Sequence, residues 1–167
     1  EEEENNKMAS SKEKQKSVKP KEETKVYTTP EKDGDPMGRI QVLVAEDNKI
    51  NQKVLKRTLL RVGIKEEIDI VDNGKLAVEA SDRKHYDIIF MDMQMPVMDG
   101  LEATSIISQR PIHPKIVFLT AHALSEYQDK AIEAGGDSFI SKPFKLDAIR
   151  DIIKSLVLCE EESEEEI

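Results

Sequence analysis

The sequence contains a single cysteine, Cys159, and no apolar run that approaches the length of a membrane span. One cysteine cannot form an internal disulfide, which fits a reducing compartment. A spanning helix needs about 20 apolar residues, so we expect a soluble, cytoplasmic chain without membrane contact, on the intracellular side if its parent protein is membrane-bound. The N-terminus is acidic and polar, so no signal peptide is visible. The three histidines are too scattered to suggest a zinc site.

Two further absences narrow the range of functions. The glycines are dispersed, so the chain has no glycine-rich loop of the kind that cradles a phosphate. The net charge of −9 is concentrated at the end of the chain, where residues 160–167 hold six acidic residues and no basic one. Residues 40–159 hold 16 basic and 18 acidic residues, a balance of only −2. A basic face for nucleic acid is therefore not evident, and no nucleic-acid partner is expected.

Composition divides the chain into three parts. Residues 1–38 are rich in Lys, Glu, Ser and Thr, have few apolar residues and no periodicity, and are predicted to be a disordered linker. Residues 39–158 are predicted to form one folded domain, since this length suffices for a proper core. Residues 159–167 are predicted to be a disordered acidic tail. The first residue is not Met, which is consistent with a piece of a longer protein.

Strand and helix signals alternate five times in the central part. Strands are expected over 40–45, 67–71, 86–91, 115–119 and 138–140. Helices are expected over 48–62, 75–83, 101–109 and 125–134, with a fifth after residue 144. In the first helix, the apolar face is expected to carry Ile50, Val54, Thr58 and Val62. This alternation predicts an α/β fold, a doubly wound five-stranded parallel sheet with helices on both faces, whose common strand order is 2-1-3-4-5.

Polar side chains stand where four of these strands end. Glu46 and Asp47 follow the first strand, Asp92 the third, Thr120 the fourth and Lys142 the fifth. Taken singly they have ordinary explanations, such as a turn aspartate or acidic residues at a helix N-terminus. Together they are expected at one sheet edge, where three carboxylates need a cation and oxygen ligands suit Mg²⁺. A carboxylate nucleophile, a metal site, a hydroxyl and an amine describe phosphoryl transfer to an aspartate.

The order and spacing of four segments resemble those of a known family. The segments are VLVAEDN at 42–48, MDMQMPVMDG at 91–100, LTA at 119–121 and FISKPF at 139–144. Over about residues 39–158 the chain resembles the receiver domain of two-component response regulators, which has a flavodoxin-like fold. The residues around Asp92 most resemble receivers at the C-terminus of hybrid histidine kinases, particularly eukaryotic ones.

The resemblance implies which residues receive the phosphoryl group and which hold the metal. Asp92 would be the phosphoacceptor and would take the group from a phosphohistidine. Asp47 would coordinate Mg²⁺ directly, and Glu46 would do so through water. Asp92 and the backbone carbonyl of Gln94 would be further ligands.

The resemblance also implies a conformational switch. Thr120 would be the switch hydroxyl, Phe139 the aromatic switch residue and Lys142 the contact to the phosphoryl group. From the sequence alone, an ordinary core aromatic is the less favoured alternative for Phe139. Gln94 and His122 occupy positions that tune the lifetime of the phosphoaspartate in the family. The peptide bond between Lys142 and Pro143 is expected to be cis.

The resemblance implies a histidine kinase domain or a histidine phosphotransfer protein as partner, and a monomeric chain. A binding module that has lost phosphorylation is the first alternative, although all five polar residues are present. A turnover enzyme is the second, although Gln94 stands where a second acid would be needed. The domain would catalyse only its own phosphorylation and dephosphorylation. No histidine-kinase catalytic motif lies within these residues, even if the parent protein is such a kinase.

Overall fold

The computed structural model describes residues 35–121 and 125–158. Within them lies a five-stranded sheet of order β2-β1-β3-β4-β5, and every neighbouring pair of strands is parallel. The strands are β1 Val42–Ala45, β2 Asp69–Val71, β3 Ile88–Asp92, β4 Lys115–Thr120 and β5 Ser138–Ser141. The predicted fold class and strand order are therefore confirmed.

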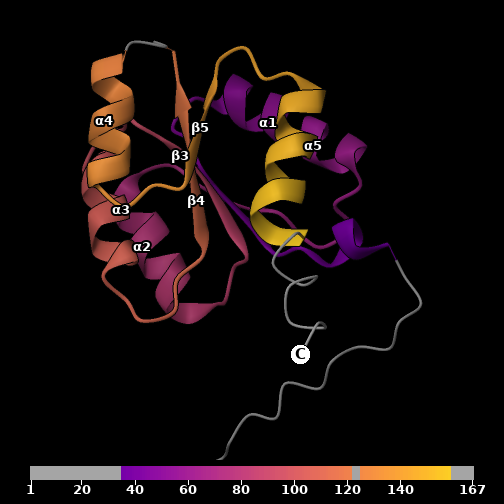
Figure 1. The fold of residues 1–167 in the computed structure, drawn as a ribbon, viewed down its shortest axis with the longest axis horizontal. Helices are drawn as coiled ribbons and strands as arrows, with labels where there is room; N and C mark the ends of the chain where they lie inside the picture. Colours follow the sequence, from indigo (N-terminus) through magenta and orange to yellow (C-terminus); the bar gives the residue numbers. More distant parts are fainter. Residues whose placement is uncertain (1–34, 122–124, 159–167) are drawn as a thin grey trace, which may run out of the picture. The chain divides into compact units, whose positions relative to one another are not determined.

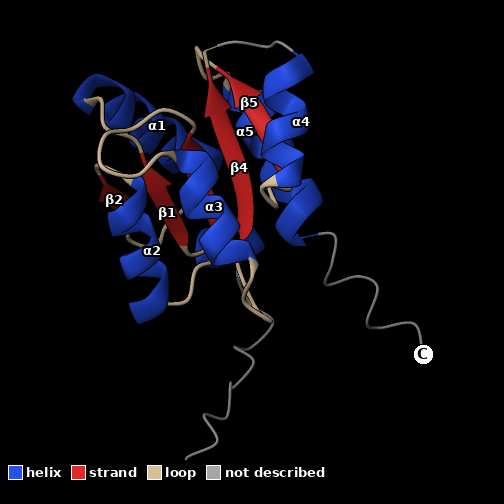
Figure 2. Cartoon of the chain, turned by 90° about the vertical axis from the view of Figure 1, so that its left-hand side faces the viewer, coloured by secondary structure: helices blue, strands red, loops and turns tan. Residues whose placement is uncertain are grey.

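In the described part of the chain, five α-helices cover the two faces of the sheet. They are α1 Lys49–Val62, α2 Gly74–Arg83, α3 Gly100–Ser108, α4 Ser125–Glu133 and α5 Leu146–Ile153, the last continuing into the π-helical turn η2 Lys154–Leu158. Figure 1 shows α1 and α5 on one face and α2, α3 and α4 on the other. Figure 2 shows the second face from the front. This doubly wound arrangement is the one that the alternating sequence signals predict.

The central strands are buried because helices cover both of their faces. Every residue of β1 and β3 is buried, and these strands are apolar except at the final position of β3. Side chains alternate between the faces, so Val42 and Val44 join one apolar cluster while Leu43 and Ala45 join the other. The core therefore consists of two layers, one on each side of the sheet.

The buried face of α1 differs from the predicted one. Gln52, Leu55 and Leu59 are buried, whereas Ile50 and Val54 are 72% and 46% exposed. Both sets of residues recur at helical spacing, so periodicity alone could not decide which set faces the sheet. The prediction for this helix face was wrong, and the outer surface of α1 carries apolar side chains next to the sheet edge.

The described residues also include the last part of the predicted linker, before residue 39. Pro36–Arg39 forms a short 3-10 helix, η1, in which Met37 is buried in the core cluster on the α1 side. The Asp35 carboxylate accepts a hydrogen bond from the Met37 N–H at 3.2 Å and caps this turn. The remainder of the predicted linker, residues 1–34, and the predicted tail, residues 159–167, lie outside the described residues. None of the helices in the described part of the chain combines the length and apolar character that a membrane crossing requires.

Three helices start with a side-chain cap just after the sheet edge. Asn48, Asn73 and Asp99 accept hydrogen bonds from the first backbone N–H groups of α1, α2 and α3, respectively. Such caps satisfy N–H groups that have no partner within the helix. They also fix where each helix starts after the sheet, and so they help to position the backbone around the polar residues at this edge.

Candidate functional site

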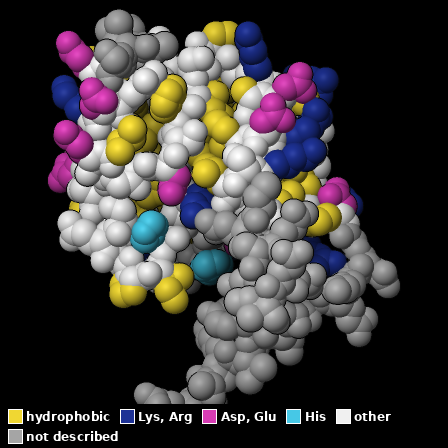
Figure 3. All heavy atoms as spheres, viewed as in Figure 1, with side chains coloured by type: hydrophobic (Ala, Val, Ile, Leu, Met, Phe, Trp, Pro, Cys, Tyr) yellow, Lys and Arg dark blue, Asp and Glu magenta, His cyan; other side chains and the backbone are white. Residues whose placement is uncertain are grey.

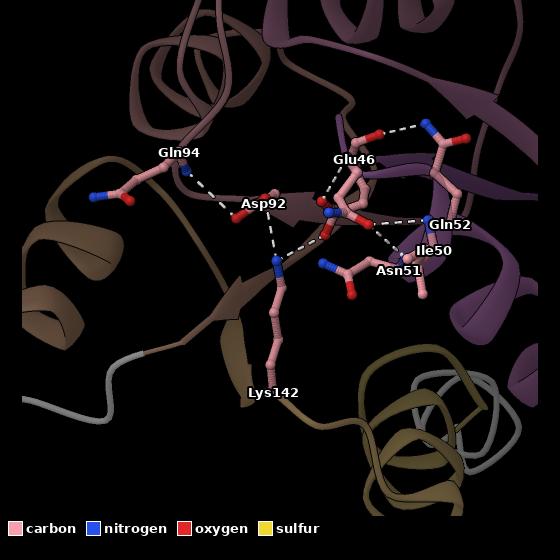
Figure 4. A network of polar contacts seen from close by, with 8 residues as sticks. Glu46, Ile50, Asn51, Gln52, Asp92, Gln94 and Lys142 are labelled. Carbon is pink, nitrogen blue, oxygen red and sulfur yellow. Dashed lines mark hydrogen bonds and ion pairs between the residues drawn. The ribbon is translucent and has the colours of Figure 1, made fainter.

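The carboxyl ends of β1, β3 and β5 bring three charged side chains together, as predicted. Asp92 ends β3, Glu46 follows β1 and Lys142 follows β5. The Lys142 Nζ lies 2.7 Å from Glu46 Oε2 and 3.2 Å from Asp92 Oδ2. Figure 4 shows this ammonium between the two carboxylates. Since β1 pairs with β3 in the sheet, the two acids are neighbours because of the strand order.

Burial makes the charges in this cluster costly. Burial, followed by the negative charge of Glu46, raises the pKa of Asp92 to about 6, against the attraction of Lys142. Burial also acts to raise the pKa of Glu46, but hydrogen bonds from Lys142 and from the Asn48 N–H outweigh it and lower that pKa. Burial acts to lower the pKa of Lys142, but its bond to Glu46 and the charge of Asp92 raise it. Glu46 and Lys142 thus form a charged pair, while ionised Asp92 is disfavoured.

Asp47 adds a third carboxylate to the cluster. One oxygen each from Glu46, Asp47 and Asp92 lie within 4.8 Å of one another. Glu46 is only 1% exposed, whereas Asp47 is exposed, so the cluster opens to solvent on one side. Oxygen-only donors at an open site fit Mg²⁺, which retains several waters. The donor set therefore fits the predicted metal.

A small cavity lies beside Asp92. Its volume is about 120 Å³, and it is lined by Asp92, Met93, Gln94, Leu119, Thr120, Ala121, Tyr127 and Lys142. The Thr120 side chain is buried at this cavity, and its carbonyl accepts a hydrogen bond from the Lys142 N–H at 2.8 Å. The Gln94 N–H donates to Asp92 Oδ1 at 3.4 Å. A hydroxyl and an amine therefore share a cavity with the carboxylate; the role of the Gln94 carbonyl as a metal ligand stays a prediction.

Two further predicted features, Phe139 and the bond between Lys142 and Pro143, lie in and just after β5. Phe139 is 38% exposed, which excludes the ordinary core position that the sequence left open. It lines a groove with Pro143 and Ile152, and Figure 3 shows apolar side chains gathered between α4 and α5. The peptide bond between Lys142 and Pro143 is cis, as predicted. His122 lies outside the described residues.

One polar residue near the site, Gln52, is not among the residues predicted from the sequence. Gln52 lies on the buried face of α1, and its Nε2 donates to the Glu46 carbonyl at 2.5 Å and to Asp72 Oδ1 at 2.7 Å. A signal for it does exist in the sequence. Gln52 stands one helical turn before Leu55, so it is a polar residue in the stripe that faces the core.

The model of the response regulator receiver domain matches residues 42–154, about two thirds of the chain. The chain belongs to this family. Hybrid signal transduction histidine kinase K of Dictyostelium discoideum is 39% identical over 131 residues, which cover 73% of this chain and 11% of that protein. Two-component response regulator 24 of Arabidopsis thaliana is 35% identical over 119 residues, which cover 71% of this chain and 84% of that protein. The receiver domain thus spans only a small part of the hybrid kinase.

Solved receiver domains share this fold. The receiver domain of sensor histidine kinase PA1611 from Pseudomonas aeruginosa, solved with a magnesium ion in its active site cleft, is 32% identical with a TM-score of 0.65; the match covers 71% of this chain and 97% of that one. The receiver domain of Saccharomyces cerevisiae Ssk1 was solved in complex with the histidine phosphotransfer protein Ypd1. That match has 32% identity, a TM-score of 0.65 and coverage of 72% and 90%. Family membership makes this chain a phosphoacceptor domain of two-component signalling.

Proposed function

We propose that Asp92 of this receiver domain takes a phosphoryl group from a phosphohistidine, with Mg²⁺ held by Glu46, Asp47, Asp92 and the Gln94 carbonyl. The domain would serve within a phosphorelay as part of a hybrid histidine kinase. The observation that carries this proposal is the Lys142 ammonium, which bridges the buried Glu46 and Asp92 carboxylates beside the cavity. A lysine held at the carboxylate before the reaction can remain there to neutralise the phosphoryl oxygens after it.

The chain's own side chains supply the groups for an in-line displacement. A carboxylate oxygen of Asp92 attacks phosphorus, so a P–O bond forms while the P–N bond to the donor imidazole breaks. The imidazole leaves with the electron pair of that bond and takes up a proton. Lys142 then pairs with the new phosphoryl oxygens, and the Thr120 hydroxyl donates to another of them. When bound, Mg²⁺ neutralises negative charge on the carboxylates and on the transferred group.

The switch that follows involves the last strand and its flanking helices. Thr120 and Lys142 lie at the ends of β4 and β5, so their movement toward a phosphoryl group pulls on both strands. The groove along β5 is open and contains the partly exposed Phe139. Inward rotation of this ring would change the groove between β5 and α5 that a downstream partner can bind.

Asp92→Asn is the direct test of the acceptor. An amide oxygen cannot form the acyl phosphate, so we expect no uptake of phosphate from acetyl phosphate in the presence of Mg²⁺, measured by intact-protein mass spectrometry. Asp99→Asn is the matched control, because asparagine caps helices as well as aspartate does. This control should be labelled like the wild type. Persistent labelling of the Asp92 variant would refute the assignment.

The exposed face of α1 is the surface that we propose meets the phosphodonor. The helix carries five basic residues and no acidic one, and it starts two residues after Asp47. Ile50 and Val54 add apolar area to this face. Because α1 starts next to the carboxylates that cluster with Asp92, we infer that a donor protein contacts this helix when its histidine reaches Asp92. The proposed partner is therefore a histidine kinase domain or a histidine phosphotransfer protein with an acidic surface around its apolar contact.

Ile50→Asp should slow phosphotransfer from a histidine phosphotransfer protein by about tenfold, the effect expected from losing one central apolar contact. Labelling by acetyl phosphate should not change, since this small donor does not touch α1. Ile112→Asp is the control, because Ile112 is 82% exposed but precedes β4, at the opposite edge of the sheet. Equal transfer rates for the two variants would exclude α1 from the docking surface. Single-turnover transfer assays provide the rates.

A further inference from the structure

The Gln52 side chain joins the ends of two strands. Its amide nitrogen has two hydrogens, and the two acceptors are the carbonyl of Glu46, just past β1, and the carboxylate of Asp72, just past β2. Gln52 is only 7% exposed, and its bond to the Glu46 carbonyl is buried, whereas the carboxylate of Asp72 at the other end is 53% exposed. Figure 4 shows its amide directed at the backbone of Glu46. The contact therefore acts on the main chain that carries the metal-site acids.

The backbone of Glu46 is held on both sides. Its N–H donates to the Val71 carbonyl at 3.1 Å, which extends the pairing of β1 with β2 by one residue. Its carbonyl is the group that accepts from Gln52. With both groups engaged, the peptide that leads into Asp47 has a fixed orientation. That orientation determines where the Glu46 and Asp47 carboxylates point relative to Asp92.

The second acceptor of the Gln52 amide, Asp72, is a charged carboxylate. Hydrogen bonds from Lys49 and then from Gln52 lower the pKa of Asp72, so it accepts as a carboxylate. The next residues continue toward the other side of the site, since the Gly74 N–H donates to the Met98 carbonyl at 2.9 Å. A series of hydrogen bonds thus connects α1, the turn after β2 and the loop after β3.

We propose that Gln52 is a positioning residue for the metal site: by holding the Glu46 carbonyl against Asp72, it sets the three carboxylates in place before the cation binds. This inference rests on the proposed function, because it assigns Gln52 to the Mg²⁺ site of that function. The three carboxylates repel one another, and a loop without this anchor would relax by moving Glu46 and Asp47 apart. Residues behind metal ligands commonly tune affinity in this way.

Simple core packing does not explain the choice of glutamine. An apolar side chain of similar length would fill the same space on the buried face of α1 without the cost of burying an amide. The amide is retained at a place where both of its donors meet acceptors at strand ends. The amide of Gln52 therefore helps to position the carboxylates at the ends of the strands. Its loss should lower the affinity for Mg²⁺ more than it lowers the stability of the fold.

The test is Mg²⁺ binding to the unphosphorylated protein, measured by isothermal titration calorimetry. Gln52→Met keeps the length of the side chain and removes both donors, and we expect the Kd for Mg²⁺ to rise about tenfold. Amide NMR of the metal-free protein should show shifts at Glu46 and Asp47, a readout that needs no metal. Leu59→Val is the matched control, because it weakens the core on the same helix face without a polar contact to the site. Its Kd should equal that of the wild type.

A second pair of variants separates the hydrogen bond from charge. Asp72→Asn and Asp72→Ala both remove the negative charge, but only asparagine keeps an oxygen that can accept from Gln52. We expect Asp72→Ala to bind Mg²⁺ several-fold more weakly than Asp72→Asn. That difference should disappear when each is combined with Gln52→Met.

Two results would overturn the inference. The first is a Gln52→Met protein that is folded, binds Mg²⁺ with the wild-type Kd and has unchanged Glu46 and Asp47 amide shifts. The second is a Kd that rises equally in Leu59→Val, which would indicate a general effect of stability. In either case the wild type would still bind Mg²⁺ and be labelled on Asp92, so the proposed function would stand. A wild type that binds no Mg²⁺ would refute both.

Discussion

Asp92→Asn is expected to stabilise the metal-free protein at neutral pH, although it abolishes phosphorylation. Burial and the charge of Glu46 raise the pKa of Asp92 from 3.8 to about 6 in the folded state. A shift of this size costs the ionised folded protein about 3 kcal/mol at most. Asparagine has the same shape without the charge, so we expect a gain of about 1–3 kcal/mol in the free energy of unfolding. Urea denaturation in the presence of EDTA measures it.

The extra stability of Asp92→Asn over the wild type should decrease as the pH falls. Because the folded-state pKa of Asp92 is raised, the folded protein binds more protons than the unfolded chain between pH 3.8 and about 6. Wild-type stability therefore increases, as far as this group is concerned, when the pH falls through that window. The variant lacks this contribution, so its advantage should be largest above pH 6 and should vanish near pH 4.

Adding Mg²⁺ tests independently whether the buried charge of Asp92 causes this difference in stability. A cation that binds only the folded wild type adds stability by mass action, so the advantage of Asp92→Asn should narrow as Mg²⁺ is added. Asp99→Asn, which removes an exposed carboxylate but keeps its helix cap, should show neither effect. A variant at Asp92 that is less stable than the wild type at neutral pH would mean that Lys142 attracts Asp92 more strongly than Glu46 and burial disfavour it.

The residues of the site could be predicted from the sequence because parallel strands deliver their last residues to one edge. Asp92, Glu46 and Lys142 are far apart along the chain. Strand order makes Glu46 and Asp92 neighbours, since β1 pairs with β3, and it places Lys142 at the same edge on the far side of β4. The length of the lysine side chain then suffices to bring its amine to both acids. The same topology implied Mg²⁺, since it predicted three carboxylates at one place.

Features that depend on packing could not be predicted in this way. Two sets of residues in α1 recur at helical spacing, and only the docking of the helix decides that Leu55 faces the sheet while Ile50 faces outward. The double contact of Gln52 depends on where β2 ends relative to β1, which a strand prediction accurate to about two residues does not provide. Hydrophobic periodicity predicts that a helix forms. The hydrogen-bond partners of a buried polar side chain on that helix can be identified only from the structure.

Gly100→Ala is expected to have the largest effect on the fold of any change near the site. Gly100 starts α3, and its N–H donates to the Met93 carbonyl at 3.0 Å. A Cβ at this position would overlap the carbonyl oxygen of Asp92 and lie 2.9 Å from its carbonyl carbon. The obstacle is backbone at the end of a buried strand, so it cannot move aside as a flexible side chain could. We expect a loss of about 3 kcal/mol in the free energy of unfolding.

Gly38→Ala is the control for the general effect of replacing glycine with alanine. There the nearest atom to a new Cβ is Cδ of Lys65 at 3.0 Å, the middle of a flexible side chain that can shift. Its stability should therefore stay within about 0.5 kcal/mol of the wild type. Gly100→Ala should also weaken Mg²⁺ binding, because the displaced peptide belongs to Asp92 itself. Wild-type stability and Mg²⁺ affinity in this variant would mean that α3 can move away from β3 without cost, and that its contact with Asp92 does not fix the acceptor.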